Sequence, residues 1–171
     1  MAVLRPAVFL DRDGTLNRPA LPGDYVRTPD ELELLAGAAH AVGMLQRAGY
    51  ACVVVSNQRG VALGLMTEQD LDAVDARLRE LTGGLDASYY CTHAIGAECD
   101  CRKPEPGLLL RAARELGLDL SASWIVGDSA ADVGAGLAAG CRALRVQPVD
   151  FALLHAVQTI LATPHTEREA A

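Results

Sequence analysis

The sequence has no excess of positive charge and no apolar run long enough to cross a membrane. Its 15 lysines and arginines stand against 22 aspartates and glutamates, a net charge of −7, so it lacks the basic footprint that binding to nucleic acid or to an anionic membrane requires. The apolar run at 7–10 stops at Asp11, and no signal-peptide cleavage pattern follows it. We therefore expect a soluble, cytoplasmic protein, a monomer, whose partner is a small molecule.

Internal repeats and the Cys-x-x-Cys motif of redox proteins are also missing, which disfavours an oxidoreductase. With 171 residues, half of them hydrophobic, the chain has room for one domain with a sizeable core and for little more. We expect a single domain that spans residues 1–171.

Short apolar runs alternate with stretches of helical periodicity along the chain. The apolar runs, which predict buried strands, lie at 7–10, 51–55, 88–91, 124–126 and 143–146. Apolar residues recur every three or four positions in the helical stretches, which lie at 37–48, 67–81, 106–116, 130–139 and 150–162. This alternation predicts an α/β fold, a three-layer Rossmann-like domain with a central parallel sheet between helices. The polar tail at 163–171 is expected to fray.

Polar, charged and glycine residues follow four of the apolar runs. Ligands of open parallel sheets bind beyond the carboxyl ends of the strands, so these residues mark a candidate active site. They are the segments 11–15, 56–58, 91–103 and 127–129.

Asp11 and Asp13 are two residues apart in an extended segment, so both carboxylates face the same side. Two carboxylates about 4 Å apart repel each other by about 4 kcal/mol at an effective dielectric constant near 20, and Asp128 and Asp132 would join them. A hard cation must hold such a cluster together, and Mg2+ binds through one or two carboxylates and a substrate phosphate. Lys103 would supply a second positive charge. The pattern favours phosphoryl transfer through an aspartyl phosphate.

Four segments in this order, FLDRDGTLN, VVVSNQ, CRKP and VGDSAAD, resemble the four motifs of the haloacid dehalogenase superfamily of phosphatases. The resemblance covers the chain from residue 7 to residue 146. It implies Asp11 as the nucleophile and Asp13 as the general acid and base. It also implies that Ser56 and Lys103 stabilise the phosphoryl oxygens.

The same resemblance implies a Mg2+ site formed by Asp11, Asp128 and the backbone carbonyl of Asp13, with Asp132 as an acid behind them. The spacing between the motifs leaves no room for a cap domain. We therefore expect an open site whose surrounding loops select the substrate.

The segment CTHAIGAECDCRKPEP holds three of the five cysteines and one of the four histidines. Cys91, His93, Cys99 and Cys101 form a Cys3His set, which is a structural zinc set with tetrahedral coordination. Zn2+ would hold this otherwise irregular loop, at 91–103, in shape. The alternative is a loop of free cysteines. The other two cysteines lie in or beside apolar runs and are expected in the core.

The chain is similar to two groups of capless superfamily members with such a cysteine loop. One group acts on D-glycero-D-manno-heptose 1,7-bisphosphate, a precursor of nucleotide-activated heptose, and the other on histidinol phosphate. The segments GDYV, at 23–26, and NQRGVALGLMT, at 57–67, favour the sugar bisphosphate. By this likeness the candidate substrate contacts are Asp24, Tyr25, Asn57, Gln58, Arg59, Arg102 and Ser129.

Within that set Arg102 is expected to read the distal phosphate or the sugar, because a guanidinium fork suits this task. The chain departs from the sugar-bisphosphate group at Leu63 and Ser129, where arginine and lysine are frequent. A function of another class also remains open, a catalytically idle phosphatase fold that serves as a binding module. Such a module has no chemical need for the full set of acidic and basic motif residues, which disfavours it.

Overall fold

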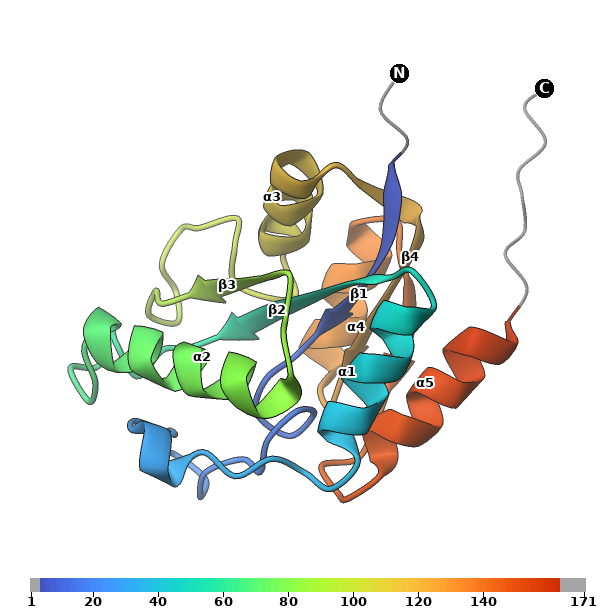
Figure 1. Ribbon diagram of the computed structural model, residues 1–171. Coiled ribbons are helices and arrows are strands. Elements are labelled where there is room, and N and C mark those ends of the chain that lie inside the picture. The colour runs from blue at the N-terminus through green and yellow to red at the C-terminus, as the bar shows by residue number, and fades with distance from the viewer. Residues whose placement is uncertain (1–3, 164–171) are drawn as a thin grey trace.

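A five-stranded sheet forms the centre of the computed structural model, which describes residues 4–163 (Figure 1). Its strands are β1 (Arg5–Leu10), β2 (Ala51–Asn57), β3 (Ala87–Cys91), β4 (Leu118–Gly127) and β5 (Arg142–Arg145). Their order is β3-β2-β1-β4-β5, and every neighbouring pair is parallel. The predicted α/β fold with a central parallel sheet is confirmed.

Helices cover both faces of the sheet (Figure 1). One face carries α1 (Ala38–Arg47), α2 (Glu68–Thr82) and α5 (Ala152–Ala162), and the other carries α3 (Gly107–Leu116) and α4 (Ala130–Ala138). Along β1, Val8 and Leu10 join the first core while Ala7 and Phe9 join the second, as the period of two in a strand requires. Because both faces are buried, the inner strands are continuous apolar runs in the sequence.

The structure departs from the sequence-based expectation at the start of β4. This strand begins at Leu118, well before the apolar run, and its first residues, Leu118 and Asp119, pair with Arg5 and Pro6 of β1. The register then shifts between Pro6 and Val8. Within the irregularity the backbone N–H of Ala7 donates to the Ser123 hydroxyl at 2.8 Å, so a side chain takes the place of a missing ladder partner.

The start of α5 also differs. Asp150 and Phe151 precede the helix instead of belonging to it, and Phe151 has a left-handed backbone with φ 64°. The Asp150 carboxylate accepts hydrogen bonds from the Ala36 backbone N–H at 2.9 Å and from the Arg18 guanidinium at 3.0 Å. These bonds tie the long loop after β1 to the start of α5. The tail expected to fray lies, beyond residue 163, outside the described residues.

The long connections after β1 and β3 contain little regular structure. Between β1 and α1 the only helix among the described residues is a short 3-10 turn, Pro29–Glu31, and the segment 92–106 is a loop. Residues 4–163 therefore include no cap domain, as the motif spacing predicted.

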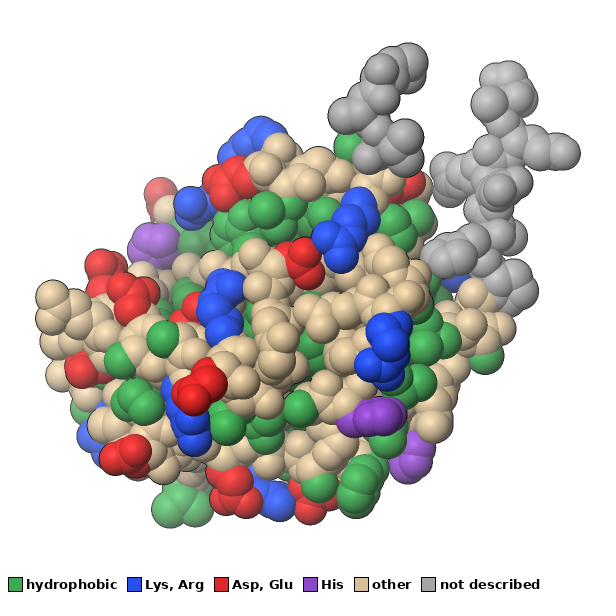
Figure 2. Space-filling view, in the orientation of Figure 1, with side chains coloured by type: hydrophobic (Ala, Val, Ile, Leu, Met, Phe, Trp, Pro, Cys, Tyr) green, Lys and Arg blue, Asp and Glu red, His purple; other side chains and the backbone are tan. Residues whose placement is uncertain are grey.

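No helix within residues 4–163 has the length and hydropathy needed to cross a membrane. On the face that Figure 2 shows, acidic and basic side chains are interspersed instead of gathered into a patch of one sign.

Candidate active site

The predicted motifs meet at one edge of the sheet. β1 lies between β2 and β4, so Asp11, which follows β1, has Ser56 of β2 on one side and Asp128, which follows β4, on the other. Lys103 reaches the same place from the loop after β3, and its ammonium bonds to Asp11. The parallel topology thus brings together side chains that are up to 117 positions apart in the chain (Asp11 to Asp128).

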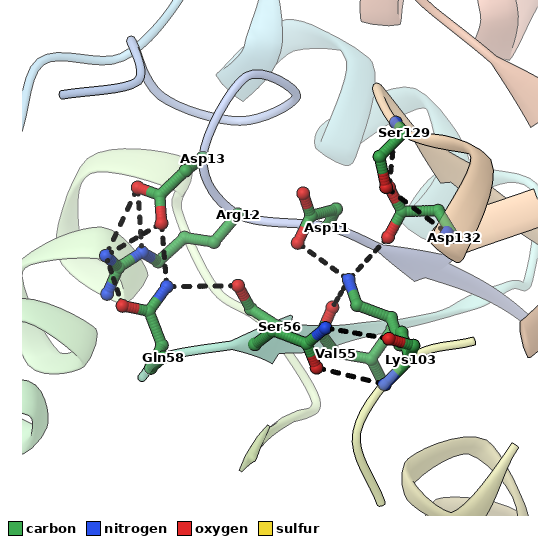
Figure 3. Close-up of polar contacts among 10 residues, drawn as sticks. Asp11, Arg12, Asp13, Val55, Ser56, Gln58, Lys103, Ser129 and Asp132 are labelled. Atoms are coloured by element: carbon green, nitrogen blue, oxygen red, sulfur yellow. Dashed lines mark hydrogen bonds and ion pairs between the residues drawn. The ribbon is translucent and has the colours of Figure 1, made fainter. Parts of the chain in front are cut away.

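Lys103 forms the centre of this edge (Figure 3). Its side chain is only 3% exposed. Nζ donates to Asp11 Oδ1 at 2.8 Å, to the Val55 carbonyl at 2.7 Å and to Asp132 Oδ1 at 2.5 Å. Burial lowers the pKa of Lys103, but Asp11 and Asp132 together outweigh burial and raise it above its ordinary value. The lysine therefore stays charged at neutral pH and offsets the carboxylates around it.

Asp11 is buried among charged groups. Its pKa is raised to about 6, chiefly by burial and further by the neighbouring Asp132 and Asp13 carboxylates, while the Lys103 charge opposes the rise. Asp11 is thus ionised at neutral pH and takes up a proton in mild acid. A cation bound beside it would favour the ionised form.

Asp11, Asp128 and Asp132 place carboxylate oxygens within 4.8 Å of one another. Asp132 is already engaged twice, because Oδ1 accepts from Lys103 and Oδ2 accepts from the backbone N–H and hydroxyl of Ser129 at 3.0 and 2.6 Å. Asp11 and Asp128 are therefore the carboxylates left to face a cation, and their hard oxygen donors fit Mg2+.

Gly14 makes the close approach of Asp128 possible. A Cβ at this position would lie 2.3 Å from Asp128 Oδ2, and the backbone φ of Gly14 is +84°. Both the space and the left-handed backbone demand glycine here. Burial, with the Asp132 charge next, raises the pKa of Asp128, as expected of a carboxylate drawn into an acidic cluster.

Asp13 belongs to a second network, beside Arg12 and Gln58 (Figure 3). Its Oδ1 accepts from Arg12 Nε and Nη2 at 3.3 and 3.1 Å and from Asn17 Nδ2 at 2.9 Å. Its Oδ2 accepts from Arg12 Nη2 at 3.0 Å and from Gln58 Nε2 at 2.7 Å. Sequence reasoning missed Arg12 and Asn17, because nothing in their spacing indicates that either side chain is buried.

Gln58 also donates to the hydroxyl oxygen of Ser56, at 3.0 Å. Ser56 is 2% exposed, and because its oxygen accepts from Gln58, its own proton remains free to donate toward the site. The Gln58 amide thus links Asp13, which follows β1, to Ser56, which lies at the end of β2.

Three of the expected substrate contacts have their side chains engaged inside the protein. Gln58 is 0% exposed and bonds to Arg12, Asp13 and Ser56, so its role as a substrate contact stays a prediction. Asn57 holds the Lys103 backbone, donating to its carbonyl and accepting from its N–H, both at 3.0 Å. Ser129 caps α4 through a reciprocal pair with Asp132.

Two other expected contacts join the loops that border the site. Arg59 Nε donates to the Tyr25 hydroxyl at 3.1 Å, and the Tyr25 ring packs so closely on Gly60 that a Cβ there would lie 3.0 Å from it. Asp24 pairs with Arg27 at 3.3 Å. The segment 23–26 therefore rests on the segment that follows β2.

Arg102 lies within the cysteine loop, and its Nη1 donates to the His93 carbonyl at 3.5 Å. Neither Arg59 nor Arg102 forms an ion pair within the described part of the chain. Both guanidinium charges are therefore open to an anionic ligand.

The cysteine loop brings its four candidate ligands together. Cys91, His93, Cys99 and Cys101 each place a donor atom within 4.8 Å of the others. The Cys91 and Cys99 sulfurs are 3.9 Å apart, and His93 Nδ1 is 3.2 Å from the Cys101 sulfur. A tetrahedral site with metal–sulfur bonds of about 2.3 Å has edges of about 3.8 Å, so the donor set has the size and chemistry of a structural Zn2+ site.

The two remaining cysteines, Cys52 and Cys141, are 0% and 5% exposed. Both belong to the packed core, as predicted from their apolar surroundings.

Comparison with known proteins agrees with the geometry. Residues 100–148 match the HAD-hydrolase-like family model. The chain is 41% identical over 141 residues to the D-glycero-beta-D-manno-heptose-1,7-bisphosphate 7-phosphatase of Photorhabdus laumondii, covering 76% of this chain and 73% of that protein. The protein of the same name from Escherichia coli K12 is 41% identical over 150 residues, covering 81% of this chain and 77% of its own.

A solved structure shares the fold. It is D,D-heptose 1,7-bisphosphate phosphatase from B. bronchiseptica, complexed with magnesium and phosphate, with a TM-score of 0.82 and 30% sequence identity. The match covers 91% of this chain and 98% of that one, so the two folds correspond over nearly their whole length.

Proposed function

Because the chain belongs to the D-glycero-beta-D-manno-heptose-1,7-bisphosphate 7-phosphatase family of HAD-like hydrolases, we propose that it removes the 7-phosphate of this sugar bisphosphate. The observation that carries the proposal is the convergence of Asp11, Ser56, Lys103 and Asp128 at one sheet edge, in a chain 41% identical to phosphatases of this name. The presence of these acidic and basic motif residues together argues against an idle binding module. The named relatives favour the heptose bisphosphate over histidinol phosphate.

The reaction proceeds in two displacements. In the first, an Asp11 carboxylate oxygen bonds to phosphorus while the bond to the sugar oxygen breaks, and Asp13 gives that oxygen a proton. In the second, Asp13 takes a proton from water, whose oxygen bonds to phosphorus and releases Asp11 and inorganic phosphate. The Ser56 hydroxyl and the Lys103 ammonium donate hydrogen bonds to the phosphoryl oxygens, where negative charge accumulates.

We propose Mg2+ as the catalytic cofactor, held by Asp11, Asp128 and the backbone carbonyl of Asp13. Bound there, it would neutralise charge on the phosphoryl group. The chain itself prepares this place: Lys103 and Ser129 occupy the oxygens of Asp132, which leaves the other two carboxylates to the metal.

The raised pKa of Asp11 predicts that Mg2+ affinity depends on pH. With a pKa of about 6 in the absence of metal, Asp11 is protonated in acid, and the proton then competes with the cation. Calorimetric titration should give a nearly constant affinity between pH 7 and 8 and a loss of about tenfold per pH unit below pH 6. Asp72→Asn, on the exposed side of α2, should titrate as the wild type does. An affinity independent of pH down to pH 5 would contradict the assignment of Asp11 as a ligand.

We propose Zn2+ as the structural metal of the loop at 91–103. Three thiolates and one neutral imidazole around Zn2+ would give the site a net charge of −1, so the metal would shape the loop and not act on the phosphate. Arg102 and Lys103 follow Cys101 directly, so the metal would also set the direction in which these two cations leave the loop.

The zinc proposal predicts about one zinc per chain by elemental analysis, lost in Cys99→Ser. The variant should melt at a lower temperature, because its loop loses the crosslink. The matched control is Cys141→Ala, which removes a core thiol and should keep the metal. Wild-type protein that contains no zinc yet is folded and fully active would exclude this site.

The substrate proposal is tested by measuring kcat/KM side by side on both anomers of the heptose 1,7-bisphosphate, on histidinol phosphate and on a generic phosphomonoester. We expect the highest value on a heptose bisphosphate, and Arg102→Ala should lower it more for the bisphosphate than for the 7-monophosphate. A preference for histidinol phosphate would reverse the ranking. Absence of turnover on every ester, with Mg2+ and folded protein, would favour the binding module. The monomeric state and the cytoplasmic location remain predictions.

A further inference from the structure

An arginine with no exposed surface lies against the carboxylate of Asp13. Arg12 is 0% exposed and is the largest of the fully buried side chains in the described chain. Its guanidinium carbon lies 6.0 Å from the centre of the Tyr90 ring, and the Tyr90 hydroxyl donates to Asp75 at 2.6 Å. Burying the arginine of an ion pair is a poor way to stabilise a fold, because the desolvation penalty rivals the attraction; the Asp13 side chain itself is 27% exposed. Because Arg12 lies next to Asp13, the proposed general acid and base, we expect a role of Arg12 in the reaction.

Every hydrogen bond that the Arg12 side chain makes within residues 4–163 goes to Asp13 or Gln58. Gln58 closes the triangle, because its Oε1 accepts from Arg12 Nη2 at 3.1 Å and its Nε2 donates to Asp13 Oδ2 at 2.7 Å. Figure 3 shows the three side chains around one another, apart from the group around Lys103. Asp13 cannot rotate without breaking bonds to both partners.

We propose that Arg12 and Gln58 are positioning residues that fix the Asp13 carboxylate and determine which of its oxygens exchanges the proton. This inference rests on the proposed function, in which Asp13 is the general acid and base. In this proposal Arg12 and Gln58, both 0% exposed, act through Asp13 and not through contact with the substrate.

The two oxygens of Asp13 are not equivalent. Oδ1 accepts three hydrogen bonds, two from Arg12 and one from Asn17, which exceeds its two lone-pair positions. Oδ2 accepts two, and one of these comes from the Gln58 amide, which also has the Ser56 hydroxyl as an acceptor. When Oδ2 takes a proton, the Gln58 amide loses Oδ2 as an acceptor but can keep its hydrogen bond to the Ser56 hydroxyl oxygen. Oδ2 is therefore the oxygen that carries the proton.

The proton balance follows directly. In the first displacement the O–H bond at Oδ2 breaks, and the proton forms a new O–H bond to the departing sugar oxygen. In the second, hydrogen leaves the attacking water and returns to Oδ2. No other donor or acceptor is needed, and Oδ1 stays bound to Arg12 and Asn17 throughout.

Leaving groups of different basicity test the inference. When the P–O bond of an alkyl phosphate breaks, the basic alkoxide that leaves needs a proton from Asp13. The 4-nitrophenolate that leaves from 4-nitrophenyl phosphate is a weak base and does not need one. In single-turnover experiments on an alkyl phosphate we expect Arg12→Met to lower the rate about 100-fold and Gln58→Met about 10-fold. The burst of 4-nitrophenolate should change less than about threefold in both, and KM should change little.

A double-mutant cycle with Asp13→Ala tests whether Arg12 acts on the reaction only through Asp13. In that background Arg12→Met should cost no further activity beyond about twofold, because the group that it positions is gone. Arg142→Met is the matched control, since Arg142 also stacks on an aromatic ring, that of Trp124, at 4.7 Å, but lies at the start of β5, away from the site. Its loss should leave the ratio of alkyl to aryl rates unchanged.

Equal losses on both leaving groups, or losses that add to that of Asp13→Ala, would overturn the inference and leave the proposed function intact. If Asp13→Ala itself leaves alkyl phosphate turnover unchanged, the acid and base assignment of the proposed function fails instead. Should Arg12→Met not fold, Gln58→Met decides the matter by the same comparison.

Discussion

Asp11→Asn should lower phosphate release by at least about 10,000-fold while the chain stays folded. The amide is a poor nucleophile, yet it has the shape of the carboxylate, and its oxygen can still accept from Lys103. Rapid-quench measurement with Mg2+ and a saturating substrate reports the effect. Asp72→Asn makes the same chemical change on an exposed side of α2 and should retain wild-type turnover.

The same variant makes a prediction about stability without metal. The pKa of Asp11 is raised in the folded chain, from an ordinary value of 3.8 to about 6, so the folded state holds the proton more tightly than the unfolded state does. Stability from this group is present in acid and is lost as the pH rises through 6. A neutral asparagine avoids that loss, so metal-free Asp11→Asn should melt no lower than the wild type at pH 7.5.

For the activity of the same variant, residual turnover near the wild-type rate would remove Asp11 from the nucleophile role.

Lys103→Met should be both inactive and unstable. Removing the ammonium leaves Asp11 and Asp132 buried and facing each other without a counter-ion. Breaking a buried ion pair in this way costs about 3–5 kcal/mol of unfolding free energy, and losing the charge on the phosphoryl oxygens should reduce turnover by at least about 1,000-fold.

The pH dependence of the stability loss in Lys103→Met distinguishes repulsion between Asp11 and Asp132 from a simple packing defect. Without the lysine, the pKa of Asp11 lies still higher than in the wild type, so protonation relieves the repulsion as the pH falls. Urea unfolding should therefore show the largest loss at pH 8 and a smaller loss at pH 5.5. The double variant Lys103→Met with Asp132→Asn, which removes one of the two charges, should recover part of the stability. A loss that is equal at both pH values would point to packing alone.

The order of strands and helices was predictable because both sheet faces are buried. Strands such as β1 and β2 are then apolar at every position, and the helices between them show a clear period. The edge at which the site lies followed from the same pattern, since parallel strands end together. Asp11, Ser56, Lys103 and Asp128 were found in this way, without knowledge of any distance between them.

What the sequence could not reveal depends on packing between strand ends. Arginine and glutamine are usually exposed, so nothing local predicted that Arg12 and Gln58 are buried against Asp13. The start of β4 was missed because Leu118 and Leu120 alternate there with polar residues instead of forming a continuous apolar run. Asn57 and Ser129 were expected as substrate contacts, which stays a prediction, and the sequence did not reveal that their side chains also bond to Lys103 and Asp132.

Lys103, buried at the centre of the site, is the only lysine among the 171 residues. Protein grown on lysine labelled with 15N at the side chain would therefore carry a single label, on the atom that faces Asp11 and Asp132. Its ammonium protons should exchange slowly with solvent, because three acceptors hold them out of water. One resonance would then report the charge at the reacting centre, free of overlap, through every stage of turnover.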